Sequence, residues 1–244
     1  MGSEMCIRDR EMYSYFASPL AYIFLVIFLV LSSGMAFYMG SLYERGQADL
    51  LPFFSFHPWL YLFLVPALAM RLWAEERKTG TIELLLTLPV SVTQAVIGKF
   101  LAAWFFIGLA LLLTFPIWIT INYLGDPDNG VVLASYLGSW LLAGAFLSVG
   151  SGISATTNNQ VIAFIVTVVV CFLLVLAGFP LVLAAFRSWA PNAVVDAVSS
   201  LSFLSHYQAI SRGVLDMRDL AFFVLVICAW LLATVLIINM KKAD

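Results

Sequence analysis

The fold is decided by a charged segment, Glu75-Glu76-Arg77-Lys78-Thr79-Gly80-Thr81-Ile82-Glu83-Leu84-Leu85-Leu86-Thr87-Leu88-Pro89, which separates two long apolar stretches. The chain around it is so apolar that the 244-residue sequence is 63% hydrophobic and only 11% charged. Soluble domains are roughly 45–50% apolar and 25% charged. With a mean hydropathy of +1.01, the chain is predicted to be an all-α membrane protein whose charged segment lies outside the bilayer.

Six segments meet or approach the roughly 20 apolar residues that a helix needs to cross the hydrocarbon core. These predicted spans are residues 19–39, 57–74, 96–121, 131–155, 161–185 and 220–239. We therefore expect a single transmembrane domain over residues 19–244, preceded by an N-terminal segment of residues 1–18. Residues 1–10 share no pattern with the rest of the chain, as an assembly or translation artefact would, and we leave them out of the interpretation.

Local signals define several of the connections. Residues 126–130 (Asp-Pro-Asp-Asn-Gly) and 156–160 (Thr-Thr-Asn-Asn-Gln) have the composition of tight turns between neighbouring spans. Pro116 and Pro180 are expected to bend or end helices locally. Small residues in the fourth span predict a surface through which helices pack closely; they are Gly144, Ser148, Gly150, Ser151, Gly152 and Ser154.

The distribution of Lys and Arg predicts the orientation. An even number of spans places both termini on the same side as the charged segment, and that side would hold Arg8, Arg10, Arg71, Arg77, Lys78, Lys99, Lys241 and Lys242. The other side would hold Arg45, Arg187, Arg212 and Arg218. Cytoplasmic loops carry the excess of basic residues. The pattern therefore predicts a multi-pass membrane protein with both termini in the cytoplasm.

Residues 186–219 would then lie outside the cell, yet apolar residues are spread through them. Irregular backbone at membrane depth is tolerated only where protein covers it or where it lines a cavity. One interpretation is a partly re-entrant segment of short helices that caps the bundle before the last span. The other is an amphipathic helix on the outer membrane surface. Tyr123, Trp189 and Tyr207 are expected to be interface anchors.

The charged segment has clear local boundaries. Gly80 suits a left-handed cap for a helix that continues the second span through Arg77. A short amphipathic helix is expected next, with Thr81 as N-cap, Glu83 in its first turn and Pro89 as its stop. The sequence Ser91-Val92-Thr93-Gln94 then has the pattern of a capping box that begins the third span.

Two functions fit such a short, rigid element between two spans. It would transmit a push from a cytoplasmic partner into the membrane, or it would be an interfacial anchor with leucines in lipid and charges among headgroups. Physical chemistry alone leaves both open.

A resemblance favours the first. The stretch from Glu76 through Pro89 to Gly98-Lys99 resembles the cytoplasmic coupling segment of type 2 ATP-binding-cassette (ABC) exporter permeases. Two further stretches resemble the same family: Ser154-Ala155-Thr156-Thr157-Asn158-Asn159-Gln160-Val161-Ile162-Ala163, and Leu201-Ser202-Phe203-Leu204-Ser205-His206-Tyr207 together with Arg212-Gly213-Val214-Leu215-Asp216. The start, Ser14-Tyr15-Phe16-Ala17-Ser18-Pro19-Leu20-Ala21-Tyr22-Ile23, is similar to the permeases associated with gliding motility.

The resemblance implies a permease of a bacterial or archaeal plasma membrane. It would pair with a second permease subunit, identical or related, and bind cytoplasmic ABC ATPases through a coupling helix. The residues assigned to ATPase coupling are Glu75, Glu76, Arg77, Lys78, Gly80, Thr81, Glu83 and Pro89. No Gly-x-x-x-x-Gly-Lys-Ser/Thr phosphate loop occurs in the sequence, so the chain is expected to have no ATPase site, catalytic residue or cofactor of its own. The transported substrate is not indicated.

Two other classes of function compete with transport. Ser151 with His206 as base would make an intramembrane serine protease, although packing is the commoner use of such small residues. An ATPase-independent channel or scaffold is the other alternative. With only two histidines and no paired cysteines at metal-ligand spacing, no metal site is expected. A net charge of −2 gives no reason to expect nucleic acid as a partner.

Overall fold

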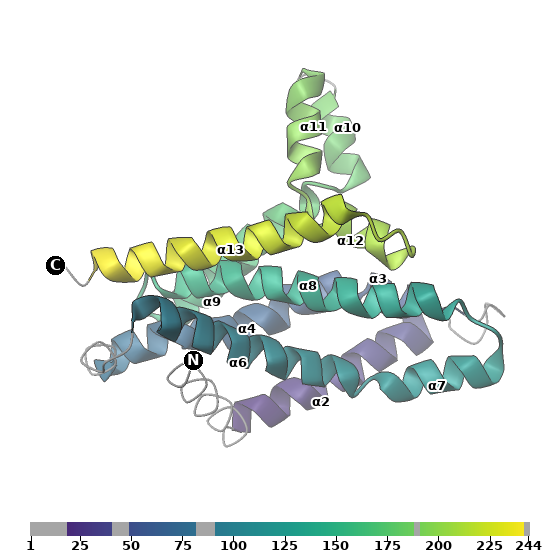
Figure 1. Ribbon diagram of the computed structural model, residues 1–244, viewed down its shortest axis with the longest axis horizontal. Helices are drawn as coiled ribbons and strands as arrows, with labels where there is room; N and C mark the ends of the chain where they lie inside the picture. Colours follow the sequence, from purple (N-terminus) through teal and green to yellow (C-terminus); the bar gives the residue numbers. More distant parts are fainter. Residues whose placement is uncertain (1–18, 41–48, 82–90, 188–190, 242–244) are drawn as a thin grey trace.

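The computed structural model describes residues 19–40, 49–81, 91–187 and 191–241, and every secondary-structure element in those ranges is helical. The long helices run roughly along the longest axis of the molecule, and the short helices α10 and α11 stand out from them (Figure 1). The all-α part of the predicted fold is therefore confirmed for the described residues.

In chain order the elements are α2 (Pro19–Gly34), the π-helix η1 (Met35–Met39), α3 (Leu51–Ser55), α4 (His57–Thr79), α6 (Val92–Leu112), α7 (Phe115–Leu124), α8 (Asn129–Ser154), α9 (Gln160–Leu176), α10 (Pro180–Arg187), α11 (Asn192–Ser200), α12 (Phe203–Ser211) and α13 (Met217–Met240). We call the end of the bundle where α4 ends and α6 begins the Gly80 end. The end where α8 begins is the Asp128 end.

Helices α4 and α8 form the centre of the bundle. All residues from 141 to 154 of α8 are buried. Small residues permit this close packing: a Cβ added to Gly150 would lie 2.4 Å from the Cβ of Ala69, and one added to Gly152 would lie 2.8 Å from the Trp230 ring. The predicted small-residue packing surface in this span is therefore confirmed.

Four described helical segments are long and apolar enough to cross a membrane: Ala21–Met39, Val92–Leu124, Asn129–Ser154 and Met217–Met240. Helix α9 is apolar but has only 17 residues. Helix α4 has 23 residues and carries His57 and Arg71, together with four charged residues in its last turns. Because α4 is surrounded largely by protein, it does not need a fully apolar surface. The count of six spans stays a prediction.

The local signals for connections are confirmed. Pro116 lies in the first turn of α7, after a break in the helix at Leu113 and Thr114. The Asp128 carboxylate accepts hydrogen bonds from the N–H groups of residues 130 and 131, which caps α8. The Asn159 side chain caps α9 in the same way. The two predicted turns are the short connections before and after α8.

Residues 186–219 hold the end of α10, all of α11 and α12, and the start of α13. Helix α12 packs into the bundle, and this overturns one expectation. Tyr207 is only 1% exposed, and its hydroxyl donates to the carbonyl oxygen of Phe54 at 2.8 Å, so it is a core residue rather than an interface anchor. Tyr123 is 89% exposed, as expected of an anchor, and Trp189 lies outside the described residues.

His206 joins three of these helices. Its Nδ1 lies 2.6 Å from Asp219 Oδ1 of α13, and its Nε2 lies 3.0 Å from the carbonyl oxygen of Ser200 at the end of α11. The ring also stacks on Phe222, with ring centroids 4.0 Å apart. These contacts fix the base of the α10–α11 pair against the bundle.

Candidate functional site

Six of the eight residues that the sequence singled out for ATPase coupling are described, and they lie together at the Gly80 end. Glu75, Glu76, Arg77 and Lys78 occupy the last two turns of α4, and Gly80 and Thr81 come directly after it. Glu83 and Pro89 lie outside the described residues, as does the amphipathic helix predicted around them. The site is thus described from both of its edges, the end of α4 and the start of α6.

Gly80 ends α4 as predicted. Its φ of 74° is left-handed, and its N–H donates to the carbonyl oxygen of Arg77 at 3.4 Å. No atom lies within 4 Å of a Cβ built on Gly80, so the backbone conformation rather than space calls for glycine here. Beside the cap, the Thr79 hydroxyl donates to the carbonyl oxygen of Glu75 at 2.9 Å and lies 2.9 Å from the Thr81 hydroxyl.

The start of α6 is equally well defined. The Ser91 hydroxyl accepts from the N–H of Gln94 at 3.2 Å, and the Gln94 side-chain oxygen accepts from the N–H of Ser91 at 3.2 Å. This reciprocal pair is the predicted capping box, and it is confirmed. The end of α4 and the start of α6 are therefore both fixed by specific backbone geometry.

An ion pair connects these two edges. Lys99 Nζ of α6 lies 2.6 Å from Glu76 Oε1 of α4, with the two side chains 4% and 19% exposed. The same ammonium group lies 5.5 Å from the centroid of the Trp73 ring, within the range of a cation–π interaction. The sequence placed Lys99 near the cytoplasmic entry of its span but did not predict this partner.

Trp73 extends the contact to α8. Its indole N–H donates to the Ser151 hydroxyl at 3.1 Å. The Ser154 hydroxyl oxygen accepts from the backbone N–H groups of Trp73 and Ala74 at 3.2 and 3.0 Å, and it donates to the carbonyl oxygen of Met70 at 3.1 Å. We call Trp73, Glu76, Lys99, Ser151 and Ser154 the polar cluster. It joins α4, α6 and α8 at the Gly80 end.

The sequence did not predict that these five residues lie together. The available signal was a spacing of three residues, which places Trp73 and Glu76 on one face of α4 and Ser151 and Ser154 on one face of α8. In an apolar bundle, polar side chains on one face of a helix are expected to meet partners on another helix. The identity of those partners required the tertiary structure.

Helix α13 reaches the same end. The Lys241 ammonium group donates to the carbonyl oxygen of Thr156, in the connection after α8. Burial and the nearby positive charge of Arg77 both lower the pKa of Lys241. Arg77 of α4 and Lys241 at the end of α13 therefore lie close enough for their positive charges to interact.

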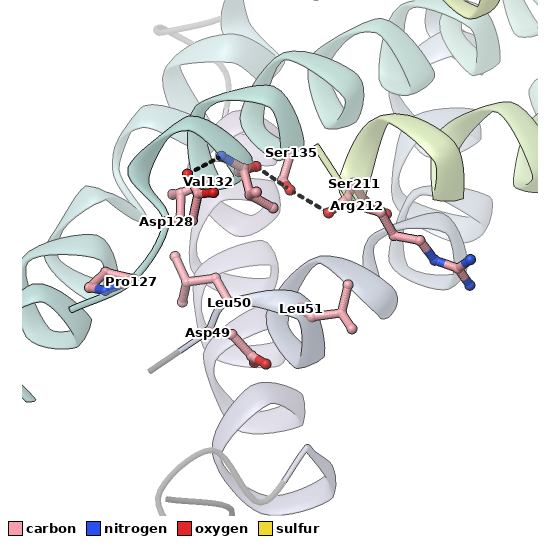
Figure 2. A pocket seen from close by; sticks show the side chains of 10 residues that line it. Asp49, Leu50, Leu51, Pro127, Asp128, Val132, Ser135, Ser211 and Arg212 are labelled. Atoms are coloured by element: carbon pink, nitrogen blue, oxygen red, sulfur yellow. Dashed lines mark hydrogen bonds between the residues drawn. The ribbon is translucent and has the colours of Figure 1, made fainter. Parts of the chain in front are cut away.

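A pocket of about 300 Å³ lies at the Asp128 end (Figure 2). It is lined by Asp49, Leu50, Leu51, Pro127, Asp128, Val131, Val132, Ser135, Ser211 and Arg212. Ser135 Oγ lies 2.8 Å from the carbonyl oxygen of Val131 and 3.1 Å from that of Ser211, which ties α8 to the end of α12. Asp128 is occupied as the cap of α8, so the polar groups here serve the helix ends.

The serine and histidine of the protease alternative are not paired. The Ser151 hydroxyl accepts from Trp73, whereas His206 is bonded to Asp219 and to the carbonyl oxygen of Ser200. A nucleophile and its base must lie within hydrogen-bond reach of each other. Because each side chain has other partners, the structure does not support hydrolysis by this pair.

Comparison with protein families gives one match. The model of a family described as ABC-2 family transporter protein matches residues 63–239, most of the chain, including α4 from its first turns and nearly all of α13. A search of curated proteins found no significant match.

Proposed function

We propose, because the chain belongs to the ABC-2 transporter family, that it is the membrane-spanning permease of an ABC exporter and that its Gly80 end receives the ATPase. The observation that carries this proposal is the construction of the charged segment. A left-handed glycine ends α4, a capping box begins α6, and the polar cluster holds both helices to α8. A segment mounted in this way passes a displacement to the spans.

We assign the binding and hydrolysis of ATP to a separate subunit. The 244 residues contain no phosphate loop of the Gly-x-x-x-x-Gly-Lys-Ser/Thr type. The ATPase would meet the side chains at the Gly80 end that reach solvent. Lys78 and Thr81 are exposed and Glu75 is half-buried, and Glu83 is added from the sequence alone. Closure of the ATPase on ATP would then push on the segment between α4 and α6.

The orientation is part of the same assignment. The Gly80 end faces the cytoplasm of a bacterial or archaeal cell, as the excess of Lys and Arg there predicts. Two permease subunits, identical or related, would enclose the path of a substrate that the chemistry of the chain does not identify. The six-span topology and the gliding-motility subgroup belong to this proposal and rest on the sequence resemblance.

The α10–α11 pair is proposed to cap the bundle on the extracellular side. Helix α10 is apolar apart from Arg187, α11 mixes apolar and polar residues, and Leu181, Val194 and Leu201 are exposed on and beside them. Exposed apolar side chains on short helices at this end suit either a re-entrant position against a partner subunit or a position in the outer interface. In both cases the His206 contacts hold the pair in place.

Co-purification tests the proposal. The tagged chain is purified in mild detergent from its own host, and the accompanying proteins are identified by mass spectrometry. We expect a phosphate-loop ATPase in stoichiometric amount. Lys78→Glu should reduce its recovery, because it reverses an exposed charge at the Gly80 end, whereas the matched reversal Asp126→Lys at the Asp128 end should not. A chain that repeatedly purifies alone would contradict the proposal and favour a channel or scaffold.

A further inference from the structure

We infer that Glu76 and Lys99 form an internal strut that makes α4 and α6 move together when the ATPase acts, and that Glu76 works through Lys99 rather than by touching the ATPase. The inference rests on the proposed function. It assigns two positioning residues for the coupling step.

The geometry points Glu76 inward. Its Oε1 lies 2.6 Å from Lys99 Nζ, and its side chain is 19% exposed, whereas Lys78 two residues later is exposed. An ion pair is stronger where water is excluded, because the effective dielectric constant is lower than in solvent. The pair is therefore a stiff connection between two helices that are joined in sequence by residues 80–91.

Contacts with α8 hold the α4 side of the strut in place. Trp73, one turn before Glu76, packs beneath the Lys99 ammonium group and donates to Ser151 of α8. Gly150, one residue before Ser151, leaves room for Ala69 of α4 and none for a side chain of its own. A force on residues 80–91 thus meets α4 already held against α8, and the ion pair carries the same displacement to α6.

One carboxylate oxygen of Glu76 has no hydrogen-bond partner in the part of the chain that the structure describes. Its Oε2 is buried without a hydrogen-bond partner among the described residues, and the same is true of Arg71 Nε and Arg77 Nε. Buried polar atoms normally have partners. Three atoms that lack one among the described residues lie on the second half of α4, so the Glu76 carboxylate can accept a further hydrogen bond when the strut is loaded.

The test uses the complex purified from its host with its ATPase. Four variants are compared: Glu76→Gln, Lys99→Met, the double variant with both changes, and the conservative Lys99→Arg. Asp126→Asn is the matched control, because it removes one carboxylate charge at the exposed Asp128 end, away from the ATPase contact. Four quantities are measured: ATPase recovery, the midpoint of thermal unfolding, stimulation of ATP turnover by the permease, and hydrogen exchange in residues 71–79 and 92–100 before and after trapping with ATP and vanadate.

In the wild-type complex we expect trapping to change exchange in both segments. Glu76→Gln and Lys99→Met should each keep ATPase recovery but lower the unfolding midpoint by about 5 °C, because the buried ion pair is broken. In both, the change in residues 92–100 should disappear, and stimulation of ATP turnover by the permease should fall about tenfold, within the usual range for coupling between sites. Lys99→Arg and Asp126→Asn should behave like the wild type.

The double variant separates a strut from a merely stabilising contact. It removes both charges of the ion pair, so its unfolding midpoint should return toward that of the wild type, while the response of residues 92–100 stays absent. Recovery of that response together with the midpoint would overturn the inference. An unchanged response of residues 92–100 in both Glu76→Gln and Lys99→Met would also overturn it. Absence of any ATPase from the wild-type preparation would instead contradict the proposed function.

Discussion

The two ends of α4 meet their neighbours through different chemistry. At the Asp128 end, Ser139 Oγ lies 2.7 Å from both His57 Nδ1 and Tyr61 Oη, and all three side chains are fully buried. At the Gly80 end the contact is an ion pair between Glu76 and Lys99 that retains some access to solvent. Neutral groups suit the deeply buried position, because an isolated buried charge costs far more than a buried hydroxyl.

The two ends also differ in how many of their buried polar atoms have hydrogen-bond partners. Four buried side-chain polar atoms lack a partner among the described residues, and three of them belong to Arg71, Glu76 and Arg77 near the Gly80 end. The fourth is His57 Nε2, for which the structure offers no explanation. An end with fixed, neutral contacts is suited to hold the bundle, and an end with spare hydrogen-bonding capacity is suited to change its contacts. Four substitutions test this contrast.

The largest effect is expected for Trp73→Ala at the Gly80 end. Trp73 is fully buried, bonds Ser151 through its indole N–H and packs against Lys99. Its loss should lower the free energy of unfolding by about 4 kcal/mol. Thermal unfolding of the purified chain measures this, with Trp73→Phe as the milder comparison, since it keeps most of the packing. A loss below that of Ser139→Ala would reverse the comparison between the two ends.

Gly150→Val should have the next largest effect, about 3 kcal/mol. The new side chain would collide with the Cβ of Ala69 and push α4 away from α8. Gly34→Ala is the control, because no atom lies within 4 Å of a Cβ at that position. Equal unfolding midpoints for the two variants would show that α4 and α8 do not pack closely in the membrane.

At the Asp128 end, Ser139→Ala should cost about 2 kcal/mol, because it leaves His57 Nδ1 and Tyr61 Oη without their shared partner. We expect the variant to be less stable but still to bind the ATPase and to stimulate its turnover. Coupling measured per folded complex distinguishes the two roles. A selective loss of stimulation, at unchanged stability, would mean that this end also transmits motion.

The smallest effect on stability is expected for Gly80→Val, about 1 kcal/mol, from the left-handed backbone alone. Its effect on coupling should be large, because α4 would extend straight instead of ending at Gly80. Gly80→Asn is the control, since asparagine adopts this conformation more readily. Normal ATPase stimulation in Gly80→Val, with Gly80→Asn unchanged, would remove the bend from the mechanism.

Local sequence predicted those features whose physics is local. Gly80 and the Ser91–Gln94 box were recognised because a helix end is fixed by a few neighbouring residues, and Asp128 and Asn159 cap helices within the turns that their composition predicted. The small residues of α8 identified a packing surface, although not the helix that packs there.

The contacts that join distant parts of the chain were not predictable in the same way. Trp73 and Ser151 are 78 residues apart, and Glu76 and Lys99 belong to different helices. Tyr207 was wrongly expected at the interface, because a tyrosine near a span end has the same sequence signal whether its helix face is turned outward or, as in α12, into the bundle. Which face is buried depends on the whole fold.

Site-specific photocrosslinking tests the central claim most directly. A photoreactive amino acid is placed at Lys78, on the exposed surface of the Gly80 end, and in a second variant at Asp126, exposed near the Asp128 end. After irradiation of membranes, the crosslinked products are identified by mass spectrometry. The account predicts a crosslink from position 78 to a phosphate-loop ATPase and none from position 126. A crosslink to the ATPase from position 126 alone, or from neither position in a complex that contains the ATPase, would contradict it.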